Sequence, residues 1–238
     1  MTAVSELRIK VFADCADADG IVRLARHPLI KGFTTNPTLM RAAGVADYEL
    51  FARGVLPCVL GLPISFEVFA DDFDEMERQA RKIATWGEPV YVKVPITNSR
   101  GESSDGVLRR VAADGVKVNV TALLTLDQVR TATACLAGGP PCFISVFAGR
   151  IADTGLDPLP LMREAVEIMA PHPNLELIWA SPREVLNVVQ ADSIGCHVIT
   201  VTHDMLKKLS LVGRDLGELS LDTVRMFHRD AEAAGFVL

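Results

Sequence analysis

Short runs of β-branched and aromatic residues alternate along the chain with longer stretches in which apolar side chains recur at helical spacing. Such runs predict strands, and the stretches between them predict helices. Because strands that alternate with helices pair in parallel, the pattern predicts an α/β protein with a (β/α)8 TIM-barrel fold. The eight expected strands are Leu7–Asp14, Gly32–Thr34, Ile64–Phe69, Pro89–Val94, Val116–Thr121, Phe143–Phe147, Leu175–Ala180 and His197–Thr202.

The helical stretches support this arrangement. Residues 71–86 have apolar side chains on one face, with acidic residues early and basic residues late, and residues 124–137 and 158–170 are similar. An amphipathic C-terminal helix is expected at about 219–234. The alternative is an open doubly wound sheet, but no Gly-x-Gly-x-x-Gly turn follows the first strand. No linker divides the chain, so residues 1–238 are expected to form one domain.

Lys93 interrupts one of the predicted strands. Strands of a parallel barrel are buried on both faces and are usually apolar throughout. In residues 90–95 (VYVKVP), the valines alternate with Tyr91 and Lys93. Since side chains alternate between the two faces of a strand, valines that pack under the helices place Lys93 inside the barrel.

The same alternation places further polar side chains on the inner face. They lie near the carboxyl ends of the strands, where barrel enzymes keep their active sites. An acid, a second acid, an amide and hydroxyl groups would then converge on Lys93. These residues are Asp14, Glu67, Asn119, Thr121 and Ser145, with Phe147 on the same face as Ser145.

A single lysine in a strand is more often a solvent-facing edge residue, because lysine is rarely buried without a partner. Here Lys93 has valines on both sides, and Asp14 and Glu67 can reach the same space. A lysine removed from water loses proton affinity, which leaves a nucleophilic amine. The two carboxylates are either structural partners of the lysine or groups that transfer protons.

Two arginines follow neighbouring strands. Arg150 comes after Gly149, which permits close approach of the backbone, and Arg183 comes two residues after Ser181. Residues 181–184 (SPRE) also match a capping box, so a helix is expected to begin there. A capped helix start and two guanidinium groups on adjacent loops suit a phosphate.

Residues 32–38 (GFTTNPT) end the second predicted strand with many hydroxyl and amide groups, including Thr34 and Asn36. Asn-Pro commonly opens a turn, so a structural role is one interpretation. The polar groups outnumber what a turn needs, which favours a binding role.

The composition limits the classes of function. The 238 residues carry a formal net charge of −6 and are 49% hydrophobic and 23% charged, which is typical of a soluble globular protein. Mild acidity argues against a nucleic-acid or membrane surface, and no apolar run reaches the ~18 residues of a membrane span. Met1–Lys10 lacks the apolar core of a signal peptide. Five scattered cysteines without a Cys-x-x-Cys pair indicate a reduced, cytoplasmic protein.

No metal site is expected. Of the five histidines, only His203 clearly follows a predicted strand, and Thr202–Asp204 is expected to begin the next helix. Clusters of histidine and carboxylate are missing from the sequence.

Five segments together resemble the successive strand motifs of small transaldolases, and the related fructose-6-phosphate aldolases share most of them. The resemblance runs in order from Leu7 to the C-terminus and includes the tail helix. It implies a barrel of the class I aldolase superfamily, needing no cofactor, in a closed homo-oligomer. The segments are residues 32–38 (GFTTNPT), 91–95 (YVKVP), 119–121 (NVT), 145–150 (SVFAGR) and 180–183 (ASPR).

The resemblance implies a role for each candidate residue. Lys93 would attack C2 of a ketose phosphate, sedoheptulose 7-phosphate or fructose 6-phosphate, and form a Schiff base. Asp14 would take the C4 hydroxyl proton as the C3–C4 bond breaks. A dihydroxyacetone unit would then pass to an aldose phosphate, as in the pentose phosphate pathway. Glu67 and Thr121 would hold a water molecule, Thr34, Asn36, Asn119 and Ser145 the three-carbon unit, and Arg150, Ser181 and Arg183 the phosphate.

Two positions bear on transfer against cleavage. Fructose-6-phosphate aldolases typically carry glutamine in place of Glu67 and tyrosine in place of Phe147. A tyrosine hydroxyl would help to protonate the released three-carbon unit, and phenylalanine cannot, which favours transfer. Pro182 departs from the aromatic residue usual at its position, which leaves the shape of the phosphate pocket and the preferred sugar open. The alternatives are a fructose-6-phosphate-type aldolase that releases dihydroxyacetone, and a sugar-phosphate-binding barrel without catalysis.

Overall fold

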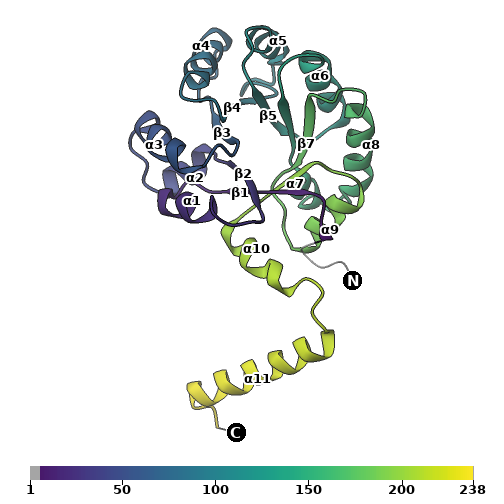
Figure 1. Cartoon of the computed structure of the whole chain (residues 1–238). Helices are drawn as coiled ribbons and strands as arrows, with labels where there is room; N and C mark the ends of the chain where they lie inside the picture. The colour runs from purple at the N-terminus through teal and green to yellow at the C-terminus, as the bar shows by residue number, and fades with distance from the viewer. Residues whose placement is uncertain (1–5, 238) are drawn as a thin grey trace.

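Eight parallel strands close into a barrel in sequence order in a computed structural model that describes residues 6–237 (Figure 1). The predicted (β/α)8 TIM barrel is therefore confirmed. Residues 1–5 and 238 lie outside the described residues. They belong to the expected domain 1–238, and residues 1–5 are also part of the Met1–Lys10 segment. The strands are β1 Lys10–Asp14, β2 Ile30–Thr34, β3 Ile64–Glu67, β4 Val90–Pro95, β5 Val118–Leu123, β6 Cys142–Val146, β7 Leu175–Trp179 and β8 Val198–Val201.

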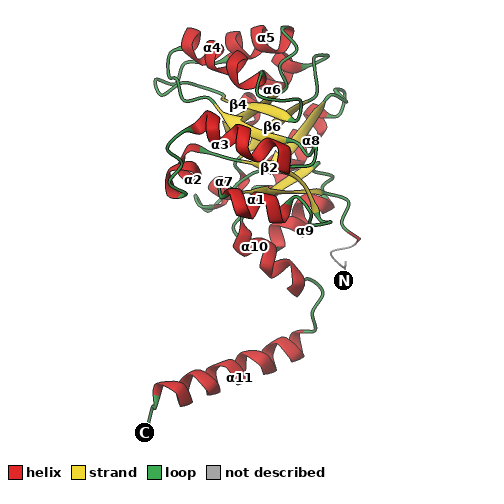
Figure 2. Ribbon diagram, turned by 60° about the vertical axis from the view of Figure 1, so that its left-hand side comes forward, coloured by secondary structure: helices red, strands yellow, loops and turns green. Residues whose placement is uncertain are grey.

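Helices follow the strands and cover the outside of the barrel (Figure 2). The three predicted stretches form α4 (Phe73–Ala84), α6 (Leu126–Leu136) and α8 (Leu159–Met169). Asp72 caps α4 by accepting from two backbone N–H groups, and Thr125 starts α6 with a capping box. The other helices are α1 Ala18–Leu24, α2 Pro37–Ala42, α3 Tyr48–Val55, α5 Asp105–Ala113, α7 Ala148–Ala152, α9 Leu186–Ser193, α10 His203–Lys208 and α11 Leu216–Ala234, with 3-10 turns η2 Leu56–Cys58 and η3 Leu209–Leu211.

The strands alternate as the sequence predicts. Val90, Val92 and Val94 of β4 belong to the large apolar core between the strands and the helices. Tyr91 instead packs in a second, smaller cluster, with its ring centroid 4.3 Å from that of Phe143. This second cluster lies inside the barrel and also contains Phe12, Ile178 and Val198.

Gly32 on β2 makes room for the floor of the barrel. A Cβ atom at this position would lie 2.5 Å from the ring of Phe12. Phe12 cannot easily swing away, because its buried ring packs edge-on against Phe143 with 5.4 Å between the centroids. The absence of a side chain at Gly32 thus lets the rings of Phe12 and Phe143 pack together inside the barrel, and these rings form its floor.

The C-terminal helix α11 leaves the barrel. After α10 and η3 the chain turns outward, and α11 projects into solvent (Figures 1 and 2). The helix is capped by Asp215 and ends at Gly235 with a left-handed backbone, and it contains no buried residue. The helix expected at about 219–234 is confirmed and begins three residues earlier. Among the described helices, including this one, none is long and apolar enough to cross a membrane.

The floor gives the first testable prediction. Gly32→Ala should lower the free energy of unfolding by about 1–3 kcal/mol, because it overpacks the Phe12 ring. Thermal unfolding followed by circular dichroism measures the change. Gly54→Ala on α3 is the control, since its Cβ would meet no atom within 4 Å. Equal melting temperatures for the two variants would contradict this account of the floor.

Candidate active site

A cavity of about 520 Å³ lies at the carboxyl ends of the strands. Ten of the twelve candidate residues line it, and the other two, Asn119 and Arg183, do not. Because the lining residues come from all eight strands or the loops that follow them, barrel closure is what brings them together. The ten are Asp14, Thr34, Asn36, Glu67, Lys93, Thr121, Ser145, Phe147, Arg150 and Ser181.

Lys93 is 6% exposed and has two partners. Its Nζ donates to the main-chain carbonyl of Thr35 at 3.0 Å and lies 3.3 Å from Oε2 of Glu67. Glu67 and Asn119 are the Cα partners of Lys93 on the neighbouring strands, so the three form one layer of the barrel. An ammonium group this deeply buried requires such partners.

Asn119 lies beneath the cavity wall. It is fully buried, donates to Ser65 Oγ at 2.9 Å and accepts from Ser145 Oγ at 2.8 Å. Its amide therefore fixes the Ser145 hydroxyl, which does line the cavity. The family resemblance implied that Asn119 contacts the substrate, and this role stays a prediction; in the structure its amide bonds Ser65 and Ser145.

Asp14 faces Lys93 from β1. It accepts from the Thr34 hydroxyl at 2.8 Å and from the Asn36 amide at 3.5 Å. The Thr34 hydroxyl lies 2.5 Å from that of Thr200, which joins β8 to the network. Burial raises the pKa of Asp14 above its ordinary value, and the charge of Lys93 and these hydrogen bonds only partly offset the effect.

Burial likewise raises the pKa of Glu67, although the nearby Lys93 opposes the shift. Asp14 adds a smaller effect in the same direction as burial, because two carboxylates share the site. The cavity thus holds a lysine beside two carboxyl groups, and burial raises the pKa of both carboxyl groups, which suits groups that exchange protons.

The backbone of the cavity wall is strained at two positions. Ala122 and Ser181 have φ values of +65° and +55°, which are costly for residues other than glycine. The pairing register between β5 and β6 shifts between Val120 and Leu123, a stretch that contains Ala122. The neighbouring Thr121 hydroxyl is buried and has no hydrogen-bond partner among residues 6–237, so its bonding capacity is unused there.

Arg150 adds a guanidinium group to the cavity wall. Its guanidinium lies 5.2 Å from the ring centroid of Phe147, in a cation–π contact. Gly149 precedes it in α7, and a Cβ there would lie 1.5 Å from the Ser181 carbonyl oxygen. Gly149 therefore allows α7 to pack directly on the loop that carries Ser181, which is the kind of close backbone approach expected of this glycine.

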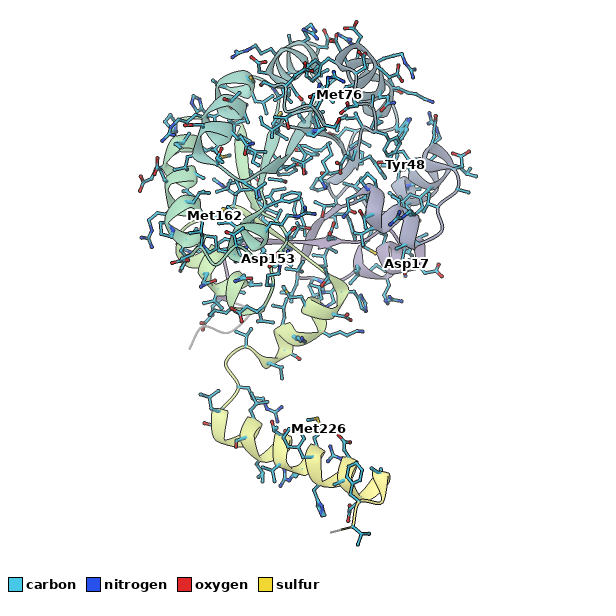
Figure 3. All side chains as sticks on the ribbon, turned by 180° about the vertical axis from the view of Figure 1, so that it is seen from behind. Asp17, Tyr48, Met76, Asp153, Met162 and Met226 are labelled. Atoms are coloured by element: carbon cyan, nitrogen blue, oxygen red, sulfur yellow. The ribbon has the colours of Figure 1, made fainter. Side chains whose placement is uncertain are left out.

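Arg183 is engaged outside the cavity lining. Its Nε donates to Oδ1 of Asp153 at 2.9 Å, and its Nη2 donates to Oδ2 of the same carboxylate. Figure 3 labels Asp153 near the middle of the molecule. The guanidinium lowers the pKa of Asp153. This bidentate pair uses the Nε–Nη2 edge of Arg183 and leaves its Nη1 edge outside the pair.

The capping box predicted at residues 181–184 is wrong. Helix α9 begins at Leu186, and Ser181 lies in a turn with a left-handed backbone. The side-chain oxygen of Asn187 accepts from the N–H groups of Arg183 and Glu184 instead. A side chain from within the helix thus satisfies the donors that the serine was expected to satisfy.

Four polar residues of the site were missed in the sequence. Ser65 and Thr200 follow the same alternation that singled out Lys93, so that signal could have found them. Thr35 acts through its main-chain carbonyl, for which residue type carries no signal. Tyr48 reaches β3 from helix α3, and no strand pattern could indicate it.

No group of three or more His, Cys, Asp or Glu residues in the described part of the chain is arranged to hold a metal ion. His203 begins α10, as predicted, with Thr202 before it. The site therefore consists of a buried amine, two carboxyl groups, several hydroxyls and one arginine on the cavity wall.

The sequence pattern of the Transaldolase/Fructose-6-phosphate aldolase family matches residues 11–238. The chain belongs to this family. Two relatives named "Probable transaldolase" are similar over most of their length. The protein of Dehalococcoides mccartyi is 31% identical, covering 84% of this chain and 90% of its own, and that of Roseiflexus castenholzii is 34% identical, covering 84% and 88%.

The fold is also found in distant structures. A protein assigned to the dihydrodipicolinate synthase family from Coccidioides immitis superposes with a TM-score of 0.64. The match covers 98% of this chain and 80% of that chain, at 12% sequence identity. At this identity the likeness concerns the barrel alone, whereas membership of the aldolase family rests on sequence.

The raised pKa of Asp14 gives a prediction for stability. A folded-state pKa above the unfolded value means that ionisation destabilises the fold at neutral pH and not below both pKa values. Asp14→Asn should therefore raise the melting temperature by roughly 2–4 °C at about pH 7.5, with a smaller gain at about pH 4. Asp230→Asn, on exposed helix α11, is the control. An equal gain at both pH values would contradict the burial argument.

Proposed function

We propose that this protein is a transaldolase, which transfers a dihydroxyacetone unit from a ketose phosphate to an aldose phosphate through a Schiff base on Lys93. The observation that carries the proposal is the buried Lys93 amine, held 3.3 Å from Glu67 in a cavity that Asp14 also lines. Family membership and the names of the relatives support it.

The first step is attack of the Lys93 amine on the C2 carbonyl of the ketose. The amine must be unprotonated, and Glu67 is the carboxylate within reach to accept its proton. Nζ adds to C2, the carbonyl oxygen leaves as water, and an iminium remains. The free hydroxyl of Thr121 is the group we assign to hold that water, together with Glu67.

The second step breaks the C3–C4 bond. Asp14 accepts the proton of the C4 hydroxyl, C4 becomes an aldehyde, and the bonding electrons pass into the iminium to give an enamine on Lys93. The raised pKa of Asp14 suits a group that must take up a proton and later return it. An incoming aldehyde reverses the step, and hydrolysis frees the new ketose.

The phosphate is assigned to Arg150, Ser181 and Arg183. Arg150 and Ser181 line the cavity. Arg183 is bonded to Asp153 by one edge of its guanidinium and retains the Nη1 edge for an anion. We assign the three-carbon unit to Thr34, Asn36 and Ser145, with Asn119 acting through Ser145.

Transfer is favoured over release by Phe147. Its ring lines the cavity beneath the Arg150 guanidinium and offers no hydroxyl to protonate the enamine. The enamine then survives until an acceptor aldehyde arrives. Cleavage with release of dihydroxyacetone uses the same lysine and is the second candidate function.

The compartment and the pathway belong to the same proposal. All five cysteines are unpaired, which fits a reducing compartment such as the cytoplasm. Exchange of three-carbon units between sugar phosphates fits the pentose phosphate pathway.

A homo-oligomer built through α11 is a further part of the proposal. Leu216, Leu219, Val224 and Phe227 share one face of this helix, and Leu216 and Phe227 are 75% and 63% exposed. A lone helix that buries no apolar surface gains little stability in water. A second copy of the chain, with its own projecting helix, would cover this face.

Borohydride trapping tests the Schiff base. Reduction in the presence of fructose 6-phosphate should attach a dihydroxyacetone-derived adduct to Lys93, detected by peptide mass spectrometry. Lys93→Met should lose both adduct and turnover while it keeps the melting temperature. Failure of the native protein to form any adduct at saturating fructose 6-phosphate or sedoheptulose 7-phosphate would refute the mechanism.

Phe147→Tyr tests transfer against cleavage. The new hydroxyl should raise release of dihydroxyacetone without an acceptor several-fold relative to transfer to an aldose phosphate. A coupled assay for free dihydroxyacetone, run with and without acceptor, measures the ratio. Rapid acceptor-independent release by the native protein would instead establish the aldolase.

Sedimentation velocity tests the role of α11. Phe227→Asp should reduce the mass of the assembly, because a charge on the apolar face opposes burial. Arg229→Asp places the same residue on the polar face and should leave the mass unchanged. A monomeric native protein would overturn the oligomer proposal.

A further inference from the structure

The ladder between β2 and β3 is cut short at the active site. The two strands pair only as far as Thr34 and Ser65. The last backbone bond runs from the Thr35 N–H to the Ser65 carbonyl, at 3.2 Å. Because donors and acceptors alternate between parallel strands, the next bond would run from the Glu67 N–H to the Thr35 carbonyl.

Both of these groups have other partners. The Thr35 carbonyl accepts from Lys93 Nζ at 3.0 Å. The Glu67 N–H donates to the Tyr48 hydroxyl at 2.7 Å, and this hydroxyl donates to the Glu67 carbonyl at 3.1 Å. The Tyr48 hydroxyl therefore takes the hydrogen bonds at Glu67 that β2 would make if it continued alongside β3.

The ring of Tyr48 is fixed in place by aromatic contacts. It comes from α3, among the elements that form the early part of the chain (Figure 3). Its ring packs edge-on against Phe66, Phe69 and Trp86, with centroids 5.9, 4.5 and 5.5 Å away. Burial raises the pKa of the phenol, so the hydroxyl stays protonated and remains a donor.

We propose that Tyr48 is a positioning residue for the Lys93–Glu67 pair. Its hydroxyl bonds the main chain of Glu67, so the Glu67 N–H does not pair with the Thr35 carbonyl. That carbonyl is then available to accept a hydrogen bond from Lys93 Nζ. Without the hydroxyl, the half-buried Glu67 N–H lacks a partner, and the next acceptor along the ladder is the carbonyl that Lys93 uses. This inference rests on the proposed Schiff-base function.

The test compares Tyr48→Phe with Tyr91→Phe. Both remove a phenolic hydroxyl, and Tyr91 lies on β4, two residues before Lys93, within the floor cluster. The measurement is the single-turnover rate at which fructose 6-phosphate forms the borohydride-trapped adduct on Lys93, followed across substrate concentrations.

Tyr48→Phe should lower the rate at saturating substrate by about tenfold, the size expected when a buried donor loses its partner. The half-saturating concentration should stay within about twofold, because the phosphate contacts are untouched. Tyr91→Phe should leave both quantities unchanged.

The outcomes separate the two proposals. No adduct on native Lys93 would overturn the proposed function, and the role of Tyr48 with it. An adduct on the native protein that forms equally fast in Tyr48→Phe would overturn the positioning role alone. A lower melting temperature with an unchanged rate, or a change only in the half-saturating concentration, would do the same.

Discussion

The ion pair between Lys93 and Glu67 is the constraint on which the site depends. Two charges inside a barrel lose their hydration, and their attraction offsets that cost only when the remaining polar groups are also bonded. The Thr35 carbonyl meets this need for Lys93, and the Thr34 and Asn36 side chains bond the neighbouring carboxylate of Asp14. The second-strand loop is therefore as much a part of the charged centre as the strands that carry the charges.

Around this centre the barrel separates its two tasks by depth. The outward-facing valines and the inner aromatic cluster contribute apolar burial, which stabilises the fold. Ala122 and Ser181, two of the three described non-glycine residues with a left-handed backbone, lie at the carboxyl end beside the cavity, and the third, Leu60, lies before β3. Strain and buried charge are tolerated there because the rest of the barrel is well packed.

Strand alternation predicted much of this arrangement. It placed Lys93, Asp14, Glu67, Thr121 and Ser145 on the inner face, and in the structure all five line one cavity. The pattern could not predict groups that act through the main chain or from outside the strands, such as the Thr35 carbonyl and the Asp153 partner of Arg183. The helix start expected at Ser181 was wrong because SPRE also fits a turn, and Asn187, within the helix, accepts from the N–H groups that the serine was expected to bond. The chemistry of the cavity came from family resemblance, since an anion site on a barrel fits many reactions.

The aromatic floor determines where substrates enter and products leave. Phe12 and Phe143 separate the reactive cavity from the opposite mouth of the barrel, so small molecules enter and leave at the same end. In the proposed reaction, the aldehyde product must then leave through the same opening before the acceptor aldehyde can enter. Kinetics in which one product departs before the second reactant binds would follow from the shape of the barrel, independently of the chemistry at Lys93.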